Sequence, residues 1–204
     1  MTDGLSFLVV EDDDAVRRSV VRGMSSHGHV DAVGTCAAAR LALRTRTFDA
    51  MIVDVRLPDG GGFDLIEPAR VRSPGIVVLV LTGSNDHGVI RRAHELRAHY
   101  LLKPCEASQL ALVAQTARER KEARERRTRA IIERWTADYG LSPTEVELLE
   151  LGADGVARDE FSGRRGVRPD TIRKQIQTLL RKTGDETFEG AVNSLLREAL
   201  AEPI

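Results

Sequence analysis

The sequence is poor in cysteine and in long hydrophobic runs. Cys36 and Cys105 are its two cysteines among 204 residues, and they show no metal-ligand spacing, which argues against a disulfide framework. The N-terminus has no basic start followed by a long apolar region. The longest apolar run, IVVLVL at 76–81, is far shorter than the about 20 residues that span a bilayer. We therefore expect a cytoplasmic protein with two free thiols and no membrane partner.

Aromatic content and net charge are low as well, at 4% and −1. The five histidines have no acid or cysteine partners at ligand spacing, so we expect surface or core positions for them. Basic and acidic residues number 13 and 14 in 1–117, 8 and 5 in 118–140, and 9 and 12 in 141–204. No segment is strongly basic, so nucleic-acid binding would have to depend on a local patch.

The first 117 residues alternate short apolar runs with amphipathic stretches. Strand-length runs occupy 5–10, 29–34, 49–54, 76–81 and 98–102. Helical spacing of apolar residues marks 13–27, the region of Ala38, Leu41 and Ala42, 63–72 and 86–98. Strands that alternate with helices imply a parallel sheet covered on both faces. We predict an α/β domain over 1–117 with a doubly wound, five-stranded parallel sheet.

In such sheets ligands bind outside the carboxyl ends of the strands. The residues found there are Glu11, Asp12, Asp13 and Asp14 after the first run, Asp54 at the end of the third, Thr82, Gly83 and Ser84 after the fourth, and Lys103 and Pro104 after the fifth. Carboxylates, a hydroxyl and an ammonium group are thus predicted on one rim of the sheet.

Carboxylates, a hydroxyl and an ammonium group together suit the binding of a metal ion and the transfer of a phosphoryl group. Clustered carboxylates repel one another, and Mg²⁺, which prefers oxygen ligands and commonly bridges to phosphate, relieves the repulsion. Lys103 would neutralise charge during phosphoryl transfer and Thr82 would hydrogen-bond a phosphoryl oxygen, which makes Asp54 a candidate nucleophile. Taken singly, Asp54 also suits a turn, the acidic run also suits a first helical turn, and Thr82 also suits a helix cap. Their order at successive strand ends favours the phosphoryl-transfer interpretation.

The segments FLVVEDDDAVRRSV, IVDVRLPDGGGFDL, VLTG and YLLKP resemble the signatures of the receiver domain of two-component response regulators, over residues 5–117. The resemblance implies a flavodoxin-like fold in which Asp54 accepts a phosphoryl group from a sensor histidine kinase. It implies that Asp12 ligates Mg²⁺ directly beside Asp54, Glu11 acts through water, and Arg56 contributes its main-chain carbonyl.

The same resemblance assigns further roles. Thr82 and Lys103 would contact the phosphoryl group, and the Lys103–Pro104 bond would be cis. Tyr100 matches the aromatic switch that moves together with Thr82 on phosphorylation, although a core aromatic is the simpler alternative. The run Gly60, Gly61 and Gly62 suits either a loop with positive φ or slack chain.

Residues 118–140 form a predicted helical linker. The stretch SQLALVAQTARERKEARERRTRAIIERWTADYG has no glycine or proline before Gly140 and is rich in strong helix formers. We expect one long helix or two in succession. Residues 118–130 lack a sustained heptad, so a strong coiled coil is not indicated. A solvated charged linker and a partner helix in a dimer remain alternatives.

Residues 141–204 read as a small all-α domain. Ser142 as N-cap, Pro143 and Glu145 predict a helix start, and Gly166 predicts a turn. Another helix follows in DTIRKQIQTLLRKTG, with Asp170 expected as its cap, and a last one in TFEGAVNSLLREAL. Two short helices, a tight turn and a helix with outward basic residues are typical of a helix-turn-helix.

A basic patch counters the acidic surplus of this segment. Residues 164–182 contain seven basic residues against Asp170 alone. Arg173, Lys174 and Gln177 are expected to face the major groove, and Thr171 and Gln175 to reach phosphates or bases. The full set of predicted DNA-binding residues is Arg168, Thr171, Arg173, Lys174, Gln175, Gln177, Arg181 and Lys182. A solvated basic face is the alternative.

The segments LSPTEVELLELGADG, TIRKQIQTLLRKTG and EGAVNSLL are similar to the DNA-binding domain of LuxR-type regulators. The sequence departs from that pattern where Gln175 replaces a histidine, Arg165 a leucine and Thr183 a leucine, and where Phe161 and Ser162 replace an Ile-Ala pair.

The resemblances imply a phosphorylation-controlled transcription regulator that binds double-stranded DNA and forms a homodimer on activation. The alternative is a phosphorylation-switched regulator whose helical output domain binds a protein instead of DNA. An enzyme with a substrate of its own is not expected, because no second domain carries a nucleophile–base pair. The receiver would catalyse only its own phosphoryl transfer and dephosphorylation.

Overall fold

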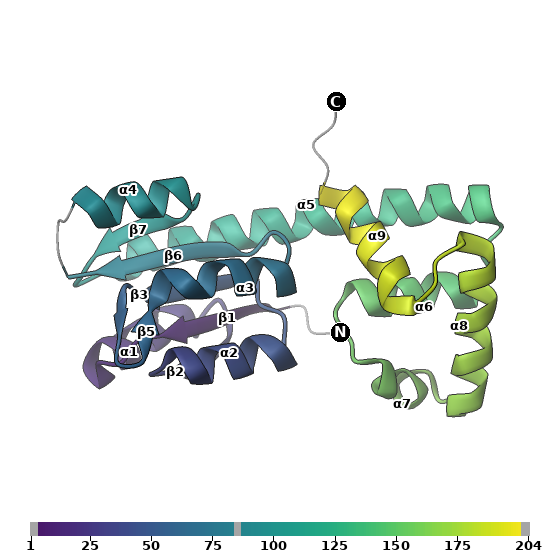
Figure 1. Ribbon diagram of the computed structural model, residues 1–204, viewed down its shortest axis with the longest axis horizontal. Coiled ribbons are helices and arrows are strands. Elements are labelled where there is room, and N and C mark those ends of the chain that lie inside the picture. The colour runs from purple at the N-terminus through teal and green to yellow at the C-terminus, as the bar shows by residue number, and fades with distance from the viewer. Residues whose placement is uncertain (1–3, 84–86, 201–204) are drawn as a thin grey trace. The chain divides into compact units, whose positions relative to one another are not determined.

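A computed structural model describes residues 4–83 and 87–200 (Figure 1), so Ser84, named above, lies outside the described residues. The chain divides into two compact units, residues 1–122 and 123–204. No helix among the described residues combines the length and the apolar character needed to cross a membrane.

The first unit is built on a five-stranded sheet. Its strands are β1 (Leu5–Val10), β2 (Gly28–Val33), β3 (Ala50–Asp54), β6 (Val77–Thr82) and β7 (His99–Leu102). They lie in the order β2-β1-β3-β6-β7, and all neighbours are parallel. Every predicted strand is present within one residue at each end. The fold prediction is confirmed.

Helices cover both faces of this sheet (Figure 1). Side chains from α1 (Asp14–Met24) and the first part of α5 (Ala107–Tyr139) pack on one face, and those from α2 (Cys36–Thr45) and α3 (Ile66–Arg72) on the other. This unit also contains η1 (Gly62–Leu65), α4 (His87–Glu95) and two short strands described below. Because alternate residues of β1 point to opposite faces, Phe7 and Leu8 belong to different cores, and both are fully buried.

The second unit is all helical. Its elements are the last part of α5, α6 (Pro143–Ala153), η2 (Arg158–Glu160), α7 (Phe161–Arg165), α8 (Pro169–Thr183) and α9 (Phe188–Leu200). Phe161 and Phe188 meet edge to face, 5.5 Å between ring centroids, in a core that also buries Leu148, Ile176 and Leu195. Gly166 has φ 62° at the end of α7, where the predicted turn leads into α8.

The predicted linker is part of one long helix, α5, of 33 residues. Its first part belongs to the first unit and its last part to the second. At residue 121, Lys121 Nζ donates a hydrogen bond to the carbonyl oxygen of Gly4 (3.1 Å), within the first unit. Ile131, Ile132 and Trp135 are buried in the core of the second unit. The apolar residues that reappear after the charged stretch therefore serve packing in that unit.

Two local expectations are wrong. Asp170 does not cap α8: Arg168 occupies the N-cap position without a side-chain hydrogen bond, and Asp170 lies in the first turn, 2.8 Å from Arg173. None of Gly60, Gly61 and Gly62 has positive φ, so neither backbone freedom nor slack accounts for the run. Two of them form the strand β5 (Gly60–Gly61), which pairs with β4 (Arg56–Leu57) in an antiparallel hairpin.

Candidate functional site

Three charged side chains from different strand ends meet at the carboxyl rim of the sheet. Lys103, which follows β7, has its Nζ 2.7 Å from Asp54 Oδ2 at the end of β3 and 2.6 Å from Glu11 Oε2 after β1. Glu11 is fully buried and Asp54 is 9% exposed. The close approach of two buried carboxylates is tolerated because the ammonium group lies between them.

The electrostatics of the cluster follow from burial and pairing. Burial raises the pKa of the Glu11 carboxyl, and the charge of Asp54 adds to this, while hydrogen bonding to Lys103 acts in the opposite direction. Burial by itself would lower the pKa of Lys103, but hydrogen bonds and charge from Asp54 and Glu11 outweigh it, and the pKa of the ammonium is raised. Lys103 therefore stays a cation throughout the physiological range.

Asp12 completes a group of oxygen ligands. Glu11, Asp12 and Asp54 each offer a carboxylate oxygen, and these atoms lie within 4.8 Å of one another. Glu11 Oε2 is buried, with the Lys103 ammonium 2.6 Å away. Hard carboxylate oxygens crowded at this spacing fit a small divalent cation such as Mg²⁺.

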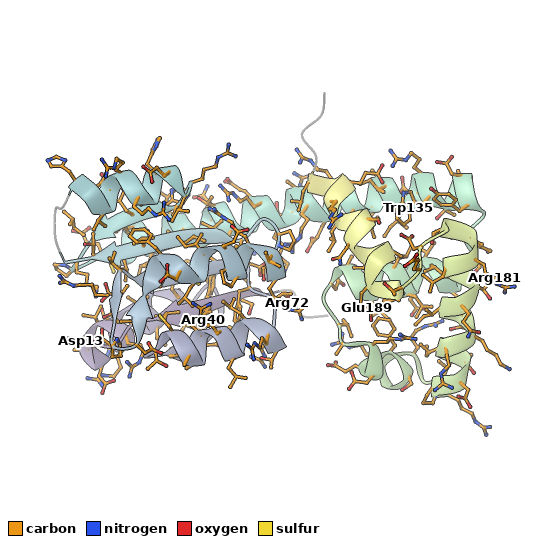
Figure 2. All side chains as sticks on the ribbon, viewed as in Figure 1. Asp13, Arg40, Arg72, Trp135, Arg181 and Glu189 are labelled. Atoms are coloured by element: carbon orange, nitrogen blue, oxygen red, sulfur yellow. The ribbon has the colours of Figure 1, made fainter. Side chains whose placement is uncertain are left out.

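The acidic run after β1 divides into two functions. Asp13 is the N-cap of α1, and its side chain accepts hydrogen bonds from the amides of Ala15 and Val16 (Figure 2 labels Asp13 at this helix start). Asp14 is ion-paired with Arg17 in the first turn. The helix-start interpretation is thus right for these two acids, whereas Glu11 and Asp12 belong to the oxygen cluster.

Arg17 supports the acidic loop and was not identified from the sequence. Its Nη1 donates hydrogen bonds to the carbonyl oxygens of Glu11 (2.7 Å) and Asp12 (3.2 Å). These bonds fix the backbone from which both carboxylates extend. The sequence carries only a weak signal for this role, since two arginines stand side by side in the first helix and only the fold selects one.

The other predicted site residues lie at their expected strand ends. Thr82 is the last residue of β6 and is 3% exposed, and its carbonyl oxygen accepts a hydrogen bond from the Lys103 amide (2.8 Å). The Lys103–Pro104 peptide bond is cis, as expected. Tyr100 lies on the edge strand β7 and is 43% exposed, so it is not a core aromatic. Arg56, two residues after Asp54, begins the β4–β5 hairpin.

The hairpin is pressed against the backbone of Asp54. The Gly62 amide donates a hydrogen bond to the carbonyl oxygen of Val55 (2.9 Å), and a Cβ added at Gly62 would lie 1.8 Å from the carbonyl oxygen of Asp54. Only glycine permits this approach. Asp59, in the hairpin turn, accepts hydrogen bonds from the amides of Cys36 and Ala37 at the start of α2, so the hairpin also anchors that helix.

Gly62→Ala is therefore expected to lower the stability of the first unit by about 3 kcal/mol or more, because the new methyl group collides with backbone atoms that cannot move aside cheaply. Amide hydrogen exchange in β3 measures the effect. Gly61→Ala is the matched control. Gly61 has φ −93°, which alanine adopts, and its added Cβ would meet only the Asp64 side chain, at 3.3 Å. Equal exchange rates in the two variants would contradict the close-approach argument.

In the second unit, the predicted DNA-binding residues differ in what they contact. Arg168, Thr171, Lys174, Gln177 and Arg181 are exposed. Figure 2 shows Arg181 extending from α8 away from the other helices of this unit. For Arg168, Lys174 and Arg181 the structure describes no acidic partner.

The other predicted contacts are engaged within the unit. Arg173 pairs with Asp170 (2.8 Å), and Gln175 Oε1 accepts a hydrogen bond from Arg165 (2.7 Å). Lys182 Nζ lies 2.7 Å from Glu145 Oε2 and donates to the carbonyl oxygen of Gly140 (2.8 Å). The basic surplus read from the sequence is thus partly neutralised by contacts within the unit.

Glu145 is the buried partner in one of these contacts. It forms a capping box with Ser142, as the sequence predicted, and is 3% exposed. Burial acts to raise the pKa of its carboxyl, but hydrogen bonds and charge from Lys182 together with hydrogen bonds at Ser142 outweigh this, and the pKa is lowered from 4.5. The cap was readable from the sequence, but the lysine was not, because it is 37 residues away in the chain.

A lowered folded-state pKa means that Glu145 stabilises the second unit fully above pH 4.5 and that this stabilisation is lost as the pH falls through the folded-state value. We expect Glu145→Gln to cost about 1–3 kcal/mol at pH 7 and to flatten this part of the pH dependence. Fluorescence of Trp135, the single tryptophan and buried in this unit, reports the urea midpoint. Exposed Glu189→Gln (Figure 2) is the control, and an equal pH slope in both variants would contradict the pairing.

Comparisons with known proteins agree with this arrangement. Residues 7–115 match the family described as response regulator receiver domain. The transcriptional regulatory protein FixJ of Azorhizobium caulinodans is 31% identical over 84% of this chain and 82% of its own length. The DNA-binding transcriptional activator DevR/DosR of Mycobacterium tuberculosis is 25% identical over 87% of this chain and 88% of its own. The crystal structure of full-length FixJ from B. japonicum is similar over 98% of both chains, with a TM-score of 0.53 and 25% identity.

Proposed function

This chain belongs to the response regulators that carry a receiver domain, and from that premise we propose that phosphorylation of Asp54 controls DNA binding by its C-terminal helical unit. The observation that supports the phosphorylation step is the meeting of Glu11, Asp12, Asp54 and Lys103 at one rim of the sheet. Receiver domains interact with histidine kinases, so the phosphoryl donor is the phosphohistidine of such a kinase.

The proposed step is a simple displacement at phosphorus. A carboxylate oxygen of Asp54 forms a bond to the phosphorus while the bond from phosphorus to the donor histidine nitrogen breaks, and that nitrogen retains the electron pair. Lys103, 2.7 Å from Asp54 Oδ2, neutralises negative charge on the transferring group, and Thr82 donates to a phosphoryl oxygen. The product is an aspartyl phosphate, and its hydrolysis by water ends the signal.

Receiver domains bind Mg²⁺ at an acidic pocket. Here the ligands would be the side chains of Asp12 and Asp54 and the main-chain carbonyl of Arg56, with Glu11 acting through water. Bound Mg²⁺ would supply charge neutralisation for the carboxylates and the phosphoryl oxygens. The hairpin that begins at Arg56 is held against Asp54 by Gly62, which fixes the position of that carbonyl.

The signal leaves the site through Thr82 and Tyr100. Thr82 lies at the end of β6, next to β7, and Tyr100 on β7 has an exposed ring. When Thr82 turns toward the phosphoryl group, the space it leaves would admit the Tyr100 ring, and the surface of α4, β7 and α5 would change. This change favours a homodimer, whose paired output units would read a roughly palindromic site.

DNA binding is proposed for the exposed side of α8. Arg168, Lys174 and Arg181 are cations without a described acidic partner, and Thr171 and Gln177 are exposed polar neighbours. A helix that follows a tight turn and presents cations is suited to the major groove and its flanking phosphates. The relatives named as transcriptional regulators over most of this chain's length support the proposal.

Selection of bound duplexes from a random pool tests this function. The protein, with Mg²⁺ and acetyl phosphate, is expected to enrich a roughly palindromic sequence, and its affinity is expected to fall steeply as salt is raised. Failure to retain any duplex in either phosphorylation state at low salt would contradict DNA binding.

The ion pairs within the second unit favour one alternative, an output unit that binds a protein instead of DNA. Because Arg165, Arg173 and Lys182 are paired with acids, the cationic surface is smaller than the sequence indicates. An output unit that binds a protein would need no DNA-binding cations. Under that alternative, removing Lys174 and Arg181 would leave phosphorylation-dependent partner binding intact.

A further inference from the structure

Arg165 holds an unusual position for a cation. It is the last residue of α7, and its side chain is only 10% exposed. Its Nε donates to Glu147 Oε2 on α6 (2.8 Å), and its Nη1 donates to Gln175 Oε1 on α8 (2.7 Å). One guanidinium therefore joins three helices. Arg165 and Gln175 are also two of the positions at which the sequence departs from the LuxR-type pattern, and the structure brings them into contact.

The contact with Arg165 fixes the orientation of the Gln175 amide. A guanidinium has only donors, so the group that faces it must be an acceptor, and the oxygen is the only acceptor of the Gln175 side-chain amide. The amide Nε2 is consequently the end that faces away from Arg165. Among the residues that the structure describes, this nitrogen donates no hydrogen bond. Gln175 remains partly exposed on α8.

Glu147 explains why Arg165 can orient the Gln175 amide without acting as a phosphate ligand. An almost buried guanidinium needs a counter-charge, and Glu147 supplies it at 2.8 Å. Glu147 is half exposed while Arg165 is not, so the charge of the guanidinium is neutralised near the surface of the unit. The Nη1 group of the same guanidinium points inward to Gln175. Arg165 is thus unavailable to DNA, although it contributes to the basic count of 164–182.

We propose that Arg165 is a positioning residue that locks Gln175 so that α8 presents the amide Nε2 as a fixed hydrogen-bond donor to an acceptor on DNA. This rests on the proposed function. The acceptor is an oxygen or ring nitrogen, either on a base edge, such as O6 or N7 of guanine, or on a phosphate. A free glutamine pairs with adenine through both its oxygen and its nitrogen, so the lock on Oε1 disfavours that bidentate contact.

The test measures affinity and sequence preference for wild type, Arg165→Leu, Gln175→Leu and the double variant, using duplexes enriched by wild type. We expect each single variant to bind about fivefold to tenfold more weakly, the value of one well-placed hydrogen bond. The double variant should bind no more weakly than either single variant, because Gln175→Leu removes the donor and Arg165→Leu removes only the contact that positions the same donor. A base acceptor would relax the preference at one position per half-site, whereas a phosphate acceptor would weaken all duplexes equally.

Arg164→Leu is the matched control. Arg164 is the exposed neighbour on α7, 3.5 Å from Glu160, so this change removes the same charge without touching Gln175. Gln175→Glu is the second variant if Arg165→Leu fails to fold, because it keeps an acceptor for Arg165 and removes the donor. Its affinity should fall at least as far as that of Gln175→Leu. Trp135 fluorescence confirms folding in each case.

Two results would overturn the inference while leaving the proposed function standing. One is an Arg165→Leu protein that binds DNA with unchanged affinity and preference. The other is a double variant whose decrease in affinity equals the product of the two single decreases, since the two residues would then act independently. Wild-type protein that binds no DNA would instead contradict the proposed function, and this inference with it.

Discussion

Asp54→Asn is expected to reduce labelling of the protein by radioactive acetyl phosphate to background, a decrease on the order of 100-fold or more. The amide keeps the size of the side chain and a hydrogen-bonding oxygen for Lys103, which lies 2.7 Å from Asp54 Oδ2. It removes the anionic oxygen that forms the bond to phosphorus. The measurement is acid-stable, hydroxylamine-sensitive incorporation of label in the presence of Mg²⁺.

Asp13→Asn is the control for this prediction. Asp13 lies two positions after Glu11 in the same acidic run, but its side chain caps α1, and asparagine caps a helix equally well. Labelling of Asp13→Asn should therefore match wild type. Wild-type labelling of Asp54→Asn would show that the phosphoryl group is attached elsewhere. Absence of labelling in both variants would show that labelling depends on the acidic residues in general and not on Asp54 in particular.

Removing the cations of α8 is expected to have the second-largest effect. The triple variant Arg168→Ala, Lys174→Ala and Arg181→Ala should bind DNA about 10- to 100-fold more weakly at moderate salt. Because each cation that neutralises a phosphate releases counterions, the slope of log affinity against log salt should become shallower by about 0.9 for each phosphate that is no longer neutralised. Fluorescence anisotropy of a labelled duplex across a salt series measures both quantities.

A matched triple variant in the receiver separates local contacts from net charge. Arg40, Arg44 and Arg72 are exposed on α2 and α3, and Figure 2 labels two of them. Their replacement by alanine changes the total charge by the same amount and should leave the salt slope unchanged. If both triple variants weaken binding alike, the exposed side of α8 has no special role in DNA recognition.

The sequence was sufficient for the sheet and for the cluster of Glu11, Asp54 and Lys103 at its carboxyl rim because their signals are local. Five apolar runs of strand length indicated the strands, and parallel strands necessarily bring their carboxyl ends to one edge. Glu11, Asp54 and Lys103 therefore had to converge, and in the structure the Lys103 ammonium lies within 2.7 Å of both carboxylates. The cap at Ser142 was also readable, because its partner, Glu145, is only three residues further along the chain.

The features that could not be predicted depend on contacts between distant segments. Gly62 was read as a flexible residue, but its role comes from a backbone that passes within 1.8 Å of where its Cβ would be. Arg165 and Lys182 were counted in the basic patch of 164–182, and their acidic partners, Glu147 and Glu145, stand 18 and 37 residues away. A charge pattern cannot tell an exposed cation from a paired one until the helices are packed.

The most direct test of the central claim is the affinity of wild type and Asp54→Asn for one selected duplex, each measured with and without acetyl phosphate and Mg²⁺ at fixed salt. We predict that phosphorylation raises the affinity of wild type by about 5- to 150-fold, the usual range of coupling between two sites, and leaves Asp54→Asn unchanged. Equal affinity of wild type in both conditions, or the same increase in Asp54→Asn, would contradict control of DNA binding through Asp54.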